Sequence, residues 1–135
     1  AKRLQNALEH DAAKARRIIW TESHRVKEDA RQAGYERVDS RGLKVEKMWV
    51  ATLDESTRHS HRLLDGQIVG VNDYFVIPGT GLKALKPGAF GVASEDINCR
   101  CGTILIYNGQ IPKERMARGQ GIINYVTYEE WKKAA

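Results

Sequence analysis

The side chains best suited to chemistry lie between Trp49 and Cys101, a region that holds both cysteines and two of the four histidines. Thiolate sulfur and imidazole nitrogen are ligands that zinc prefers in proteins. A thiol held against an imidazole is also the arrangement of a catalytic cysteine. Polar groups gathered between hydrophobic strands can equally form a buried network that fixes the packing of a domain. The sequence therefore offers three hypotheses for one group of residues.

The metal hypothesis takes two thiolates and one imidazole as ligands of a tetrahedral zinc ion. These ligands are His61, Cys99 and Cys101. The candidates for a fourth ligand are Asp54, His59 and Glu95. Structural zinc sites usually have two pairs of cysteines with two to four residues between the members of a pair, whereas this chain has one pair with a single spacer. The alternative is that both cysteines are buried as small apolar side chains at the start of a strand.

The catalytic hypothesis places Cys99 or Cys101 against His61, with Asp54 as the acid that orients the imidazole. His61 is preferred to His59, because on a short helix His61 shares a face with residues three and four positions away. The residue types suit a nucleophile and a base, but their spacing along the chain does not show that they converge. The sequence therefore assigns no catalytic residue beyond this hypothesis.

The third and leading hypothesis is a buried polar network. An arginine guanidinium binds a carboxylate through two parallel hydrogen bonds, so the two arginines of the region are expected to pair with nearby carboxylates. The members of this network are Glu22, Asp54, Arg58, His61, Asp65, Asn98 and Arg100. Such a network would join the N-terminal helix to the second helix, and loss of one partner would leave a charge unpaired in a dry environment.

A long helix is predicted over residues 3–34, because apolar and small residues recur there at steps of three or four and form one face. They are Leu8, Ala12, Ala15, Ile19, Val26, Ala30 and Ala33. Glu22 falls on the same face, where a carboxylate is costly unless it meets a cation. We expect Glu22 to point toward an arginine, with extension into solvent as the alternative. Gly34 is expected to end the helix.

The remaining pattern predicts strands at about 43–50, 67–71, 74–77 and 102–107, and a short helix near 57–64. The fold class is therefore α+β, with a long N-terminal helix packed on a small, mainly antiparallel sheet, a short second helix and long glycine-rich loops. We expect two parts, an α+β domain over residues 1–109 and a basic flexible segment over 110–135. A short helix ends the second part, and Thr127 and Glu130 have the spacing of a capping box.

Composition limits the class of protein. The 135 residues suffice for one domain, and a hydrophobic fraction of 41% with 29% charged residues indicates a small core. No run of apolar residues approaches the roughly 18 that a membrane span needs, so no span is expected. The first residues lack the apolar centre of a signal peptide, and the absence of an initial Met indicates a fragment or a processed piece.

The net charge of +5 is compatible with a polyanionic partner but does not by itself identify one. Several cations lie in glycine-containing loops, where they could follow a phosphate backbone without reading the bases. They are Lys83, Lys86, Lys113, Arg115 and Arg118. The alternative is ordinary solvated surface charge. The spacing of a helix-turn-helix or a zinc finger is absent from the sequence.

The same residues resemble a known family. The pattern consists of Trp49, Asp54-x-x-Thr57-Arg58-x-x-His61-x-x-Leu64-Asp65-Gly66, Phe75, Pro78-Gly79 and Asn98-Cys99-Arg100-Cys101. Upstream, Trp20-Thr21-Glu22 is similar to a helix of the same family, although Trp20 stands where an arginine is usual. Together they resemble the phage Mu protein F-like family of minor head and head-morphogenesis proteins of tailed bacteriophages and prophages. The resemblance covers residues from about 14 to 107.

The resemblance implies a structural protein of the head interior that contributes to head assembly and to DNA packaging or delivery. Its implied partners are the portal protein, other head proteins and packaged DNA bound without sequence specificity. It would reside in the virion head, and in the cytoplasm of the bacterial host during assembly. Some relatives carry a toxin module, so the alternative is a metal-dependent enzyme or toxin-type effector centred on His61 and Cys99/Cys101. The head protein is preferred to the enzyme, and no cofactor is implied apart from the zinc hypothesis.

Overall fold

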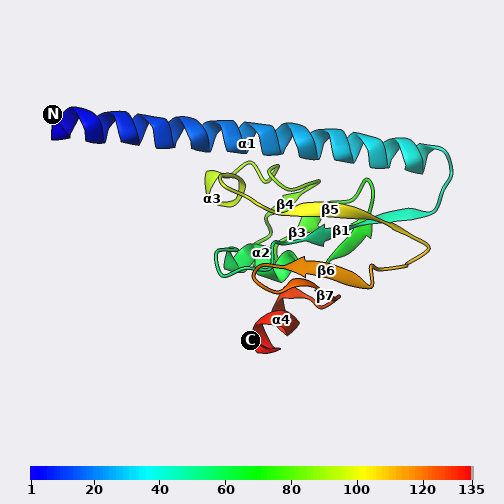
Figure 1. The fold of residues 1–135 in the computed structure, drawn as a ribbon. Coiled ribbons are helices and arrows are strands. Elements are labelled where there is room, and N and C mark those ends of the chain that lie inside the picture. Colours follow the sequence, from blue (N-terminus) through cyan, green and yellow to red (C-terminus); the bar gives the residue numbers. More distant parts are fainter. Residues whose placement is uncertain (135) are drawn as a thin grey trace.

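The computed structural model of the protein describes residues 1–134 as an α+β fold, which confirms the predicted class. The helices are α1 Lys2–Ser40, α2 His59–Leu64, α3 Ala93–Asp96 and α4 Tyr128–Ala134. The strands are β1 Val45–Val50, β2 Ile68–Gly70, β3 Phe75–Val76, β4 Lys83–Ala84, β5 Gly102–Tyr107, β6 Glu114–Ala117 and β7 Gly121–Asn124. In Figure 1, α1 runs along the top of the molecule, and all the strands lie together below it. None of the helices in the described part of the chain combines the length and the apolar character that a membrane crossing requires.

The central sheet has the order β2-β1-β5, and both pairs of strands are antiparallel. In its register, Val50 lies opposite Gly102 at the end of the sheet that is nearest to the cysteines. Two smaller antiparallel pairs, β3-β4 and β6-β7, flank this sheet. The predicted strands therefore exist, with shorter bounds than expected for β2 and β3, while α3, β4, β6 and β7 are elements that the sequence pattern did not reveal.

The main core forms where β1 meets α2, the β3-β4 pair and the loop that precedes β5. Trp49 is fully buried, and its ring makes an edge contact with Phe75, with 5.2 Å between ring centroids. Phe90 packs on the same indole at 5.9 Å. Both cysteines are buried members of this cluster. The cysteines therefore lie inside the hydrophobic core, and the Cys101 carbonyl oxygen contacts His24 of α1.

The N-terminal helix is longer than predicted, because it passes through Gly34 and ends at Ser40. A glycine inside a helix costs about 1 kcal/mol relative to alanine. The last turns of the helix offset this cost through contacts with the sheet, where the Tyr35 hydroxyl donates to the Thr103 carbonyl oxygen at 3.0 Å. Gly34 therefore does not end the helix.

The face of α1 that packs on the domain is polar, which corrects the expectation that the apolar face points inward. His24 Nε2 lies 2.7 Å from the Cys101 carbonyl oxygen, and Gln32 donates to the Val71 carbonyl oxygen at 2.8 Å. The apolar residues lie on the opposite side, where Ile19 is 65% exposed and Val26 is 66% exposed. We call this side the exposed apolar face, formed by Leu8, Ala12, Ala15, Ile19, Val26, Ala30 and Ala33.

Glu22 shares the exposed apolar face and is itself exposed, so the expectation that it joins a buried network is wrong. Its carboxylate lies 3.5 Å from the Arg25 guanidinium one helical turn away, and about half of each side chain is open to solvent. An exposed pair of this kind contributes little to stability, because water screens both charges. Glu22 therefore has no part in holding the helix to the domain.

Lys47 is a fully buried lysine at the centre of β1, and it gives the first testable prediction. Its ammonium donates to Gln32 Oε1 and to the Leu85 carbonyl oxygen, and burial lowers its pKa to about 8. Between that value and 10.5, the ordinary pKa of a lysine side chain, the unfolded chain binds more protons than the folded chain. The contribution of this side chain to the free energy of unfolding therefore rises with pH across that interval.

Urea denaturation at several pH values checks this prediction against a Lys47→Met variant, which cannot titrate. Relative to the variant, the native protein is expected to gain up to about 3 kcal/mol between pH 8 and 10.5. A difference that stays constant with pH would show that Lys47 keeps an ordinary pKa. Comparing the two proteins at each pH cancels the titration of tyrosines and cysteines in the same range.

The part of the chain after residue 109 forms the hairpin β6-β7 and the helix α4. Ala117 and Tyr128 pack on Leu53 in a second, smaller core cluster. Leu53 also forms a parallel bridge with Ala117. At the start of α4, the Glu130 N–H donates to Thr127 Oγ1 at 3.4 Å, one half of the predicted capping box. The division of the chain into two parts at residue 109 stays a prediction, although these contacts tie the second part to the first.

Candidate functional site

The imidazole of His61 and the two thiols meet in the core. His61 Nδ1 lies 3.3 Å from Cys101 Sγ and 3.8 Å from Cys99 Sγ. His61 is on α2, whereas the cysteines directly precede β5, where alternation along an extended chain turns both thiols to the same side. All three side chains are buried, and their ligand atoms lie within 4.8 Å of one another. The structure thus brings together the three residues of the metal hypothesis.

The other nitrogen of His61 faces a carboxylate. Nε2 lies 3.0 Å from Glu95 Oε2, a close ion-pair contact that is not aligned as a hydrogen bond. The Ser60 hydroxyl donates to the same oxygen at 2.7 Å and fixes the carboxylate. Because a negative charge attracts the ring proton, Glu95 favours the tautomer with hydrogen on Nε2. Nδ1 then presents its lone pair to the thiols.

The two thiols have opposite electrostatic environments. The pKa of Cys99 is lowered, first because the Cys101 thiol donates a hydrogen bond to it and then because of His61. The pKa of Cys101 is raised, first by burial and then by the neighbouring charge of Cys99. The indole N–H of Trp49 acts on Cys101 in the opposite direction. The pair therefore holds one negative charge more readily than two when no cation is beside it.

The loop before the cysteines is held by Arg58. Its guanidinium donates to the carbonyl oxygen of Glu95 at 2.6 Å and also to that of Ile97. Arg58 was expected to pair with a carboxylate, and the structure assigns it to backbone oxygens instead, because α3 ends within its reach. Asn98 follows with a φ of 57°, a left-handed conformation that asparagine tolerates. This turn directs Cys99 back toward His61.

Asp54 and Arg100 form a bidentate ion pair, two groups that the sequence placed in one network. Arg100 Nη2 donates to Asp54 Oδ1 at 2.8 Å, and Nη1 contacts the other oxygen. This hydrogen-bonded guanidinium holds the pKa of Asp54 well below its usual range. Since Asp54 is committed to Arg100, it does not orient His61, and Glu95 occupies the place that the catalytic hypothesis gave to Asp54. His59, another candidate fourth ligand, is exposed on α2.

A second buried pair joins Asp65 to Arg115. Arg115 donates to Asp65 Oδ2 at 2.8 Å, and the backbone N–H groups of Ala51 and Tyr128 donate to the same carboxylate. Both side chains are almost fully buried. Arg115 was expected to contact nucleic acid, and this expectation is wrong because its guanidinium is enclosed by protein. Sequence gave no signal for this pair, because Arg115 lies among glycine-containing loops and resembles a surface cation.

The other candidate cations lie on two separate elements. Lys83 and Lys86 lie in and beside β4, where Lys86 is paired with Asp29 of α1 at 2.6 Å and Lys83 lies over the Tyr74 ring. Lys113 and Arg118 flank β6 and are exposed.

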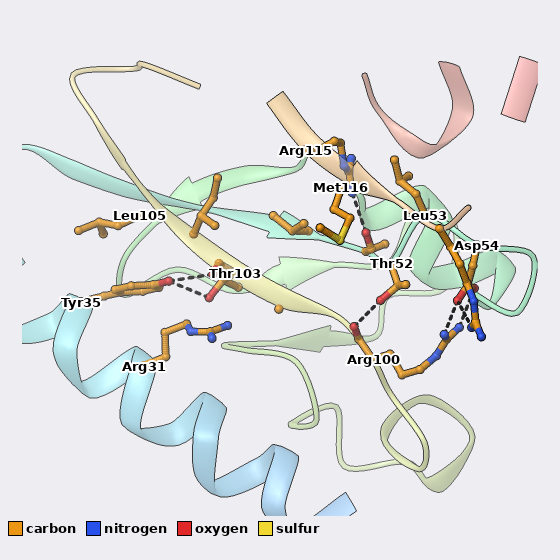
Figure 2. A pocket seen from close by; sticks show the side chains of 15 residues that line it. Arg31, Tyr35, Thr52, Leu53, Asp54, Arg100, Thr103, Leu105, Arg115 and Met116 are labelled. Atoms are coloured by element: carbon orange, nitrogen blue, oxygen red, sulfur yellow. Dashed lines mark hydrogen bonds and ion pairs between the residues drawn. The ribbon is translucent and has the colours of Figure 1, made fainter. Parts of the chain in front are cut away.

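Between β5, β6 and α1 lies an open cavity of about 790 Å³ (Figure 2). Arg100 contacts Asp54 at one end of it, and Tyr35 of α1 contacts Thr103 at the other. Arg118 lines the same cavity and is 75% exposed. The cavity thus has an apolar strand on one side, and at its rim the Asp54 carboxylate is paired with Arg100 and lies 3.5 Å from Arg118.

Comparison with known proteins places this fold in a family. The sequence model described as Phage Mu protein F like protein matches residues 1–104. The chain is 39% identical to minor head protein GP7 of Bacillus phage SPP1 over 139 aligned residues, which cover 98% of this chain and 44% of that protein. It is 38% identical to NAD(+)--arginine ADP-ribosyltransferase EFV of Enterococcus faecalis (strain ATCC 700802 / V583) over 132 residues, 97% of this chain and 27% of the relative.

The chain therefore spans less than half the length of either relative. No solved structure matches it. The family match extends from α1 into β5 and so includes the histidine, both cysteines and the Asp54–Arg100 pair. The resemblance that the motifs predicted is confirmed, and the chain belongs to the Phage Mu protein F like family.

Proposed function

We propose that this chain is a structural component of a phage or prophage head, a minor head protein that contributes to head assembly and to DNA packaging or delivery. The observation that carries the proposal is the 39% identity to a minor head protein across 98% of the chain. The proposed location is the interior of the virion head, after assembly in the cytoplasm of the bacterial host. The portal protein and other head proteins are the proposed partners.

The exposed apolar face of α1 supports a role in assembly. Its residues recur at steps of three and four, the spacing that packs one helix against another. Leu8 is 61% exposed and Ile19 is 65% exposed, although both are large apolar side chains. An apolar stripe in water, here interrupted by Glu22, favours association with another protein surface. We propose that a helix of the portal or of another head protein covers this face.

The exposed cations support a second contact, with packaged DNA. Arg118 and Lys113 flank β6 and are open to solvent. They would meet phosphates without reading base sequence, and the resulting affinity would fall steeply with salt. The net charge of +5 attracts the protein to DNA whichever side of the protein faces the DNA first.

The second relative is named as an ADP-ribosyltransferase, and this chain corresponds to 27% of it. That enzyme and a minor head protein both match almost the whole of this chain. Such a segment is suited to being joined to different neighbouring domains in different proteins. We propose that the shared segment is the head module in both settings. The second candidate, a toxin-type effector, would instead place the activity of that relative in the shared segment, and it is supported by this relative's name and by the thiol–imidazole cluster.

The test is incorporation of the chain into heads or portal rings when it is co-expressed with the head proteins of its own phage or prophage. The variant Leu8→Glu/Ile19→Glu places two charges on the exposed apolar face. It is expected to lose most of the incorporation seen with the native chain, because burying an unpaired carboxylate opposes helix packing. Sedimentation of heads and quantification of the chain within them give the readout.

A matched control places the same two charges on the other side of the same exposed helical segment, through Asn6→Glu/Ala13→Glu. This variant is expected to be incorporated like the native chain. Equal incorporation of both variants would reject the exposed apolar face as the docking surface. Absence of the native chain from heads and portal rings would reject the head-protein proposal itself.

A further inference from the structure

We propose that His61, Cys99 and Cys101 form a zinc site in which three protein ligands hold one ion. Two thiolates and one imidazole make a ligand set that favours zinc over harder divalent cations. The inference concerns a property of this chain that is independent of its role in the head. It rests on the geometry of three buried side chains and of the groups that position them.

The distances fit tetrahedral coordination. Zinc binds thiolate sulfur at about 2.3 Å and imidazole nitrogen at about 2.0–2.1 Å, which places a sulfur and a nitrogen of one tetrahedral site roughly 3.6 Å apart. The observed separations of His61 Nδ1 from the two sulfurs are 3.3 and 3.8 Å. These values lie on either side of the ideal one, so the two nitrogen–sulfur separations need shifts of only a few tenths of an ångström, and all three ligand atoms lie within 4.8 Å of one another.

The histidine is oriented as a metal ligand. Metal-binding imidazoles commonly direct the second ring nitrogen at a carboxylate, which fixes the tautomer and makes the first nitrogen more basic. Glu95 lies in this position, 3.0 Å from Nε2, and Ser60 holds its carboxylate. Glu95 is therefore a positioning residue, on the far side of the ring from the thiols, and not the fourth ligand.

The backbone of the two cysteines is fixed before any ion binds. Thr52 Oγ1 donates to the Arg100 carbonyl oxygen at 2.8 Å, and His24 of α1 contacts the Cys101 carbonyl oxygen at 2.7 Å. The buried indole N–H of Trp49 has no hydrogen-bond partner among the described residues, although it lies close enough to stabilise a negative charge on Cys101. A zinc-bound thiolate would give this N–H an acceptor, and the ion would neutralise the second charge of the pair.

The fourth coordination position opens on a cavity. A cavity of about 420 Å³ adjoins the three ligands, and Thr57, Asn98 and Trp20 of α1 also line it. Neither of the other candidate fourth ligands fills this position, because Asp54 binds Arg100 and His59 is exposed. The proposed fourth ligand is therefore a water molecule or a small anion that enters from this cavity.

The experiment is elemental analysis of the reduced, full-length chain purified without chelator, with zinc as the metal supplied. We expect about one zinc ion per chain, and its loss in both Cys99→Ser/Cys101→Ser and His61→Gln. His59→Gln is the matched control, since it changes an exposed histidine two positions away, and should keep the ion. Glu95→Gln should keep the stoichiometry while weakening zinc roughly 10–100-fold in competition with a chelator.

Cobalt(II) provides a readout that does not depend on the variants folding, because thiolate ligation gives an intense charge-transfer absorption in the native chain. Circular dichroism verifies that each protein is folded. Zinc well below one per chain together with no thiolate–cobalt absorption in the folded, reduced native protein would overturn the proposal. Zinc retained by the folded double-cysteine variant would also overturn it. Neither result bears on incorporation into heads, so this proposal and the head-protein proposal can fail separately.

Discussion

Replacing Asp65 with asparagine is expected to lower the free energy of unfolding by about 3–5 kcal/mol. Asp65 accepts hydrogen bonds from Arg115 and from two backbone N–H groups at the junction of the main domain and the hairpin. The neutral amide leaves the Arg115 charge unpaired in a site that water does not reach. Urea denaturation followed by circular dichroism measures the change.

The control for this prediction is an exposed ion pair in the same part of the fold. Glu55 accepts from Lys132 of α4 at 2.7 Å, and its side chain is 74% exposed. Glu55→Gln is expected to leave the stability nearly unchanged, because water already screens such a pair. Similar losses in the Asp65 and Glu55 variants would show that burial does not decide the contribution of these pairs.

Replacing Trp49 with alanine is expected to cost about 3–5 kcal/mol of stability, because removal of a buried aromatic side chain leaves a cavity that the core cannot fully close. Trp49 is fully buried and packs against Phe75 and Phe90. His61 also makes an edge contact with the indole, with 5.7 Å between centroids. The substitution should therefore loosen the imidazole as well as the core, and thermal and urea denaturation give the size of the loss.

Trp20 supplies a control of the same residue type. It lies on α1 at the rim of the cavity beside His61, and it is 51% exposed. Trp20→Ala is expected to change stability by less than about 1 kcal/mol, since it creates no enclosed cavity. A loss comparable to that of Trp49→Ala would mean that the N-terminal part of α1 is packed more tightly than the structure shows.

Sequence reasoning was most informative where chemistry and local pattern coincide. The alternation around Cys99 and Cys101 predicted that both thiols share a side, and the preference for His61 over His59 agrees with the burial of His61 and the exposure of His59. Asp54 and Arg100 were named as members of one network, and they form a bidentate pair. These residues lie close in sequence to the elements that orient them, so local periodicity carries the information.

The orientation of α1 was not predictable in the same way. An apolar stripe shows that one side of a helix avoids water, but it does not show whether the covering surface belongs to the same chain. Here the domain receives the polar side of the helix, through hydrogen bonds from His24 and Gln32 to backbone oxygens. Such contacts depend on carbonyl groups that become available only after the sheet has formed.

The hairpin β6-β7 was missed for a related reason. Its strands have only four residues each and show no apolar alternation, and its stability comes from long-range contacts. Arg115 is an example, because an arginine between glycine-containing loops resembles a surface cation until its partner is known. The buried partner, Asp65, lies 50 residues earlier in the chain.

The length of α1 has a consequence for how the protein meets its surroundings. A helix of 39 residues is roughly 58 Å long, and all its residues before Arg17 are exposed. Without tertiary packing, a helical segment of this size is only marginally stable in water. It therefore samples helix and coil, and a partner that captures the helical form completes its folding. This segment can thus bind a partner far from the domain, but binding requires the segment to become ordered, which lowers the affinity. This combination favours reversible attachment during the assembly of a larger particle.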